Sequence, residues 1–94
     1  MKPRPIAILW PDEQNFARFR EVCGDIQSQT LNAYLAAIAV DIKAKESRGI
    51  IFERIEFDPD DLLAFAKAAG FDRAVSQVRA GFAVTLQQKR HRTD

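Results

Sequence analysis

The residues that could carry out chemistry in this 94-residue chain are few, and most stand where a structural role explains them. Acidic side chains gather at Asp12-Glu13 and between Asp58 and Asp61, where paired carboxylates could act as acid and base or hold a divalent ion. Both groups fall at predicted helix starts, where a carboxylate caps the helix and faces its positive dipole end. No calcium-loop pattern accompanies them. We therefore expect these acids to be structural.

The single cysteine and the single histidine are the other candidates for chemistry. Cys23 falls at the C-terminal end of a predicted helix, where the negative end of the dipole raises a thiol pKa, so a buried, unreactive thiol is expected. His91 lies in a basic C-terminal tail, and pairing it with Cys23 would require that tail to fold back over the first helix. Because the chain has one cysteine and one histidine, the sequence excludes an internal disulfide and a structural zinc site.

No nucleotide-binding or nucleophile motif occurs in the sequence. It contains no G-x-x-x-x-G-K-[ST], G-x-G-x-x-G or G-x-S-x-G pattern, and its four glycines provide little material for a phosphate-binding loop. We therefore expect a protein that is not an enzyme and that has no cofactor or metal site.

Charge is unevenly distributed along a chain whose formal net charge is +1. Residues 50–72 carry six acidic against two basic side chains, whereas residues 73–93 carry five basic side chains and no acid. The last helix and its tail could therefore contact nucleic-acid phosphates. A solvated helix end whose basic side chains complement the helix dipole explains the same pattern. The chain as a whole also lacks the broad basic field that is typical of nucleic-acid-binding proteins. The candidate contacts are Arg79, Lys89, Arg90 and Arg92.

Large apolar side chains are abundant for so small a core. The chain has seven phenylalanines, one tryptophan and one tyrosine, and alanine rows on two predicted helices allow close helix contact. Trp10 ends the first predicted strand and Tyr34 lies early in the second predicted helix. Amphipathic rings of this kind are common interface anchors, although both could instead pack over the sheet. Trp10 and Tyr34 are therefore the candidate interface residues.

Six elements must position these residues. The proline-bounded apolar run Ile6–Trp10 predicts a strand buried on both faces, and residues 50–57 predict a second, more charged strand. Helix-start and glycine signals predict helices over 11–23, from Ser28 or Thr30 to Gly49, from Asp58 to Gly70, and from Asp72 toward a basic tail, 89–94, that frays. Gly81 inside the last helix suggests a close backbone approach.

Together these elements predict a single α+β domain over residues 1–94, in the order βααβαα, with two short strands packed by four helices. The two halves of the sequence resemble each other at an offset of 46–48 residues. A duplication would produce this resemblance, and so would the use of the same local signals for leaving a strand and ending a helix in both halves. Two strands leave two open edges, so either helices cover both or one edge pairs with its copy and extends the sheet across a dimer. The apolar first strand fits the centre of such a sheet.

These patterns favour a non-catalytic interaction or regulatory protein that acts as a homodimer and could also bind another protein. The alternative is a small nucleic-acid-binding protein that uses the last helix and tail. The run Ile6–Trp10 is too short for the core of a signal peptide, and Ala33–Val40 is far below the roughly 20 residues of a membrane span. We therefore expect a cytoplasmic protein without a membrane partner.

Overall fold

The computed structural model describes residues 4–92 and contains the elements in the predicted order. The α+β class and the order βααβαα are confirmed. The strands pair in parallel, with Ile6 opposite Phe52 and Leu9 opposite Ile55, because two intervening helices return the chain to the starting end of the sheet. The elements are β1 (Ile6–Leu9), α1 (Phe16–Cys23), α2 (Leu31–Glu46), β2 (Phe52–Ile55), α3 (Pro59–Ala68) and α4 (Ser76–His91).

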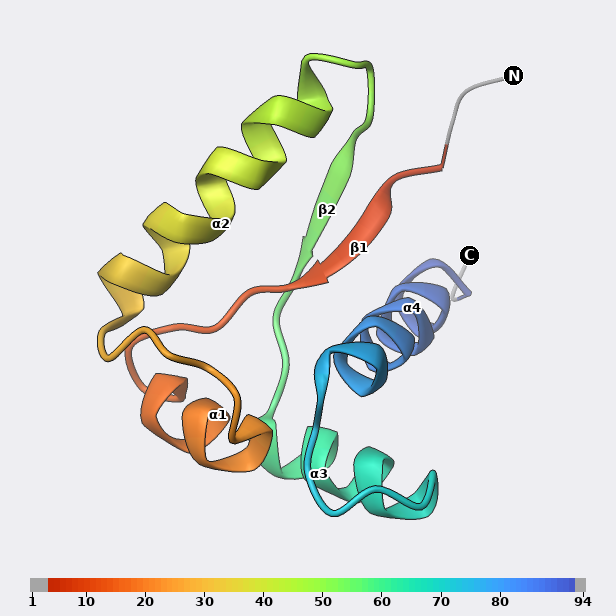
Figure 1. Cartoon of the computed structure of the whole chain (residues 1–94). Helices are drawn as coiled ribbons and strands as arrows, with labels where there is room; N and C mark the ends of the chain where they lie inside the picture. Colours follow the sequence, from red (N-terminus) through yellow and green to blue (C-terminus); the bar gives the residue numbers. More distant parts are fainter. Residues whose placement is uncertain (1–3, 93–94) are drawn as a thin grey trace.

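Helices α2 and α4 lie on opposite sides of the two strands, while α1 and α3 lie beyond the carboxyl ends of the strands (Figure 1). Strand residues alternate between the two faces. Leu9 and Ile55 are buried on the face toward α4, whereas Ile8 and Phe52 are half-buried on the face toward α2. We call these the α4 face and the α2 face of the sheet.

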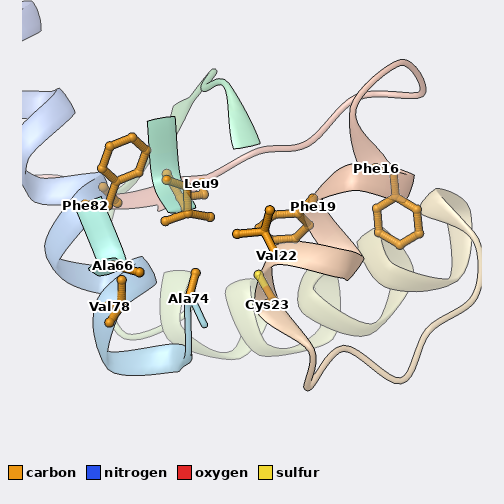
Figure 2. Close-up of a cluster of buried hydrophobic side chains, with 11 residues drawn as sticks. Leu9, Phe16, Phe19, Val22, Cys23, Ala66, Ala74, Val78 and Phe82 are labelled. Carbon is orange, nitrogen blue, oxygen red and sulfur yellow. The ribbon is translucent and has the colours of Figure 1, made fainter. Parts of the chain in front are cut away.

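The main hydrophobic core lies between α1, α3, α4 and the end of β1. Figure 2 shows side chains from these elements converging on one cluster, with Phe19 from α1 and Phe82 from α4. Phe19 and Leu62 have no exposed surface. The core therefore fixes α4 against the α4 face, whereas α2 contributes no fully buried residue to this cluster.

Helix α1 begins at Phe16, five residues later than the sequence predicts. The Asp12 carboxylate accepts hydrogen bonds from the main-chain N–H groups of Gln14 and Asn15, both at 2.9 Å. Such a side-chain turn offers the backbone an alternative to helical hydrogen bonds, so residues 12–15 form a turn. The predicted end is confirmed, since Gly24 adopts a left-handed conformation with φ of 76°.

Helix α4 begins at Ser76, and the prediction that Asp72 caps it is wrong. The Ala74 N–H donates to the Val22 carbonyl at 3.0 Å and the Ala74 side chain is fully buried. This long-range contact holds residues 72–75 across the end of α1, outside the helix. At its other end α4 continues to His91, past the position at which fraying is predicted, and residues 93–94 lie outside the described part.

Burial around the strands is lower than the sequence predicts. The expectation that β1 is buried on both faces is wrong, because only Leu9 is buried and Ile6 is 47% exposed. Helix α2 is capped by Thr30, whose hydroxyl accepts from the Ala33 N–H at 3.1 Å. Ile42, however, is the one residue of α2 that is buried. Helix α2 therefore covers its face of the sheet loosely.

Within residues 4–92, no helix is both long enough and apolar enough to cross a bilayer.

Candidate interaction surface

The outer edge of β1 carries main-chain groups that have no hydrogen-bond partner within residues 4–92. On the inner edge, the Ile6 N–H donates to the Ile51 carbonyl at 2.8 Å and the Trp10 N–H also donates toward β2, at 2.9 Å. Successive residues of a strand point their main-chain groups to opposite edges, so those of Ala7 and Leu9 point away from β2. The outer edge therefore offers two N–H donors and two carbonyl acceptors.

Two prolines limit this open edge to Ala7 and Leu9. Pro5 and Pro11 follow the same alternation, but proline has no N–H to point outward. The Pro5 carbonyl accepts a hydrogen bond from the side-chain amide of Gln87 at 2.9 Å. The unpaired segment consequently has defined ends and four open groups.

A cleft of about 360 Å³ runs along this edge, and we call it the β1 edge cleft. The whole of β1 forms its floor, α2 forms one wall and α4 forms the other. The α2 wall presents Tyr34 and Ile38, and the α4 wall presents the small side chains of Ala80 and Ala83. An apolar cleft with unpaired main-chain groups at its floor suits an extended polypeptide segment.

Charged side chains at the two rims of the cleft are paired within the chain. On α2, the Lys45 ammonium lies 2.9 Å from the Asp41 carboxylate. On α4, the Arg79 guanidinium donates to the Asp25 carboxylate and to the Ala74 carbonyl, both at 2.8 Å. Because each rim cation has its own anion, the cleft has little net charge to attract an ion.

Tyr34, one predicted interface residue, is half-buried in the wall of this cleft. Its ring centroid lies 5.6 Å from that of Phe16 and 5.7 Å from that of Phe19. Burial raises the pKa of the Tyr34 hydroxyl, so the hydroxyl stays neutral. Tyr34 therefore packs against the core and lines the cleft at once.

Trp10, the other predicted interface residue, lies in a separate hollow of about 360 Å³ between β2 and α2. The Arg54 guanidinium carbon lies 4.3 Å from the centroid of the Trp10 ring, a cation–π contact. Val40 on the adjacent part of α2 is 73% exposed. The structure thus places Trp10 and Tyr34 in different hollows.

The outer edge of β2 is partly covered by the C-terminal end of α4. The Arg90 guanidinium donates to the main-chain carbonyl of Arg54 at 3.3 Å. On the α4 face, the Glu53 carboxylate accepts from the Gln87 amide at 3.0 Å and lies 3.0 Å from His91 Nε2. Hydrogen bonds with Gln87 and then His91 lower the pKa of Glu53. The β2 edge is therefore more protected than the β1 edge.

The four basic residues predicted to contact nucleic acid do not form one patch. Arg79 is ion-paired near the start of α4, whereas Arg90 lies about 16 Å further along the helix and 3.4 Å from the Glu53 carboxylate. Lys89 and Arg92 are exposed near the C-terminal end. Nucleic-acid binding by this end of α4 stays a prediction.

The groups that could have carried chemistry hold structural positions. Cys23 lies in the core, and burial raises the pKa of its thiol to about 11. The Asp58 carboxylate caps α3 by accepting from the Asp60 N–H at 2.8 Å. Within the described residues, 4–92, no three His, Cys, Asp or Glu side chains are placed to hold a metal ion.

The sequence did not point to Ala7 and Leu9 as the residues whose main-chain groups form the open edge of β1. Their apolar side chains fit a buried strand, and only strand pairing reveals which main-chain groups stay open. The sequence nevertheless contains a signal for this edge. Pro5 and Pro11 stand at alternate positions with Ala7 and Leu9, and a proline at such a position has no N–H to donate from the edge.

No known protein family, curated protein or solved structure matches this chain.

Proposed function

We propose that this chain is a non-catalytic interaction or regulatory protein that acts as a homodimer. The observation that carries the proposal is the open edge of β1 at the floor of an apolar cleft. Unpaired strand edges readily pair with another chain, and proteins usually cover or interrupt them. Here the neighbouring helices form walls beside the edge but supply no hydrogen bonds to Ala7 or Leu9 within residues 4–92.

Exposed aliphatic side chains support self-association. Ile6 on the cleft floor is 47% exposed, and Val84, one turn beyond Ala80 on α4, is 44% exposed. Helix α2 has a single buried residue, Ile42. A chain of this size buries a limited fraction of its surface, so covering apolar area in a dimer would add stability.

Light scattering and analytical ultracentrifugation test the proposal. At micromolar concentration and above, we expect a mass twice that of the 10.6 kDa chain. A species that keeps the mass of one chain up to near-millimolar concentration would contradict it.

Two lysine variants locate the contact. Ile6→Lys places a charge on the cleft floor, whereas Ile51→Lys changes a side chain of similar exposure, 53% against 47%, outside the cleft. We expect Ile6→Lys to weaken dimerisation by at least about tenfold, since a charge must then be desolvated. Ile51→Lys should have the smaller effect, and circular dichroism verifies that both variants fold.

A further inference from the structure

We propose that two copies of this chain pair their β1 strands antiparallel across a two-fold axis, giving a four-stranded sheet in the order β2-β1-β1-β2. The inference rests on the proposed homodimer and adds the strand, direction and register of the contact. The occupant of the cleft must be extended, because only extended main chain can pair with the open groups of Ala7 and Leu9. A second β1 is such a segment, and it carries the same unsatisfied edge.

One register pairs every open group. Residues directly opposite each other in an antiparallel sheet can exchange two hydrogen bonds. Placing Ala7 opposite Leu9 of the second copy, and by symmetry Leu9 opposite Ala7, uses all four open groups of each strand. Ile8 then lies on the two-fold axis, opposite Ile8 of the second copy.

The flanking prolines disfavour the neighbouring registers. If Ala7 lay opposite its own copy, Leu9 would face Pro5 of the second copy. If Leu9 lay opposite its own copy, Ala7 would face Pro11 of the second copy. Proline has no N–H to donate, so each of these registers leaves acceptors on the edge unpaired.

The side chains fit the same register. On the α4 face, the small Ala7 side chain lies beside the larger Leu9 of the second copy, which avoids contact between two leucines. Ala80 and Ala83 line the α4 wall of the cleft, and their small side chains leave room for the Leu9 side chain of the second copy. On the α2 face, Ile8 meets Ile8, a β-branched pair of the kind that stabilises sheets.

The charges on the α2 wall are compatible with a second copy. Asp41 and Lys45 have opposite signs and lie one turn apart on the cleft side of α2. A two-fold axis perpendicular to the sheet makes the two α2 helices antiparallel, which reverses the order of the two charges. Each Asp41 can then lie toward Lys45 of the second copy, so like charges need not meet.

Disulfide trapping tests the register. In a Cys23→Ala parent, Ile8→Cys places two thiols at a non-hydrogen-bonded pair, whose Cα atoms are about 4.5 Å apart and within disulfide range. Ile6→Cys is the matched control on the same face of the same strand. In the proposed register its two copies are more than about 13 Å apart, which is beyond disulfide reach.

The expected result is a difference between these two variants. Under mild oxidation, Ile8→Cys should lose its monomer band to a reducible dimer at least about tenfold faster than Ile6→Cys. Equal rates, or faster trapping of Ile6→Cys, in a protein that is dimeric by light scattering would overturn the register and leave the homodimer standing. A protein with the mass of one chain at every concentration would overturn both.

Amide hydrogen exchange of the unaltered protein gives a second readout that needs no variant. The Ile8 N–H points toward β2 and is protected in monomer and dimer alike, so it serves as the internal control. The Ala7 and Leu9 amides should exchange at least about tenfold more slowly in a concentrated, dimeric sample than in a dilute, monomeric one. Fast exchange of both amides in a dimeric sample would overturn the proposed pairing.

Discussion

Two glycines show how backbone conformation and local packing act at the scale of one residue. Gly24 ends α1 with φ of 76°, a conformation that side chains with a Cβ rarely adopt, and the Arg73 side chain occupies the space of a Cβ. Gly81 lies inside α4, and a Cβ there would meet the Phe65 ring at 3.8 Å, an ordinary contact distance. The prediction of a close backbone approach at Gly81 is therefore wrong.

Gly81→Ala should stabilise the protein. An alanine in a helix interior loses less conformational freedom on folding than glycine, which is worth roughly 0.5–1 kcal/mol. The space beside Phe65 accepts the added methyl group. The midpoint of thermal unfolding should therefore rise by several degrees, and a fall would mean that α4 packs more tightly here than the structure indicates.

Gly24→Ala is the matched variant with the opposite expected sign. It imposes a strained left-handed conformation and displaces the Arg73 side chain. A loss of about 1 kcal/mol or more is expected in denaturant unfolding. Equal effects of the two substitutions would contradict the conformational explanation.

At the scale of elements, polar contacts hold α4 at both of its ends, to the segment after α1 near its start and to β2 near its C-terminal end. Near its start, Arg79 binds Asp25, and near its C-terminal end Gln87, Arg90 and His91 surround Glu53 of β2. The second group lowers the pKa of Glu53, with the Gln87 hydrogen bond as its largest cause. A carboxylate whose pKa is lower in the folded state stabilises that state at neutral pH.

This stabilisation should disappear in acid. It is fully present above the pKa of an unfolded glutamate, about 4.3, and is lost as the pH falls through the lower pKa of folded Glu53. Unfolding midpoints measured from pH 7 down to about pH 3 should therefore fall less steeply in Glu53→Gln than in the unaltered protein. Gln87→Leu should raise the pKa of Glu53 toward its ordinary value, as measured by NMR titration.

Glu56→Gln is the control for this acid effect. Glu56 is an exposed carboxylate just beyond β2, and within residues 4–92 it has no ion pair. Its variant should keep the pH dependence of the unaltered protein. If Glu56→Gln removed as much of the acid sensitivity as Glu53→Gln, the network around α4 would not be its source.

At the scale of the whole molecule, the two faces of the sheet are covered unequally. The α4 face meets the main core through Leu9, whereas on the other side α2 buries only Ile42. The β1 edge cleft opens between these two layers. A second copy that occupies the cleft would contact both layers, so folding and dimerisation should be coupled.

The unfolding midpoint should consequently rise with protein concentration. Association of folded chains, but not of unfolded ones, shifts the unfolding equilibrium by mass action. A hundredfold increase in concentration should raise the midpoint of reversible thermal unfolding by a few degrees. A midpoint that does not change over this range would contradict the coupling.

Much of the local structure could be predicted from the sequence because its causes lie within a few residues. Asp58 caps α3, Thr30 caps α2 and Gly24 ends α1, each through conformations or hydrogen bonds spanning at most four residues. The predicted cap at Asp72 is wrong, since the contact between Ala74 and Val22 joins residues about fifty positions apart.

Some features of the β1 edge cleft could also be predicted from the sequence, and others could not. The sequence predicted two strands with open edges and gave reasons to consider Tyr34, which does line the cleft. It did not predict that the strands are parallel, nor that Ala7 and Leu9 are the residues whose main-chain groups remain open. The strand direction depends on the path by which α1 and α2 return the chain, and the open main-chain groups depend on the edge of β1 with which β2 pairs.

The sequence by itself determined the α+β class, the order of the six elements and several helix ends, because these follow from local propensity, capping and apolar periodicity. Only the tertiary structure decided strand direction, the weak burial of α2, the attachment of His91 to Glu53, and the cleft along β1. These features arise from contacts between distant residues, whose energies depend on how the elements pack.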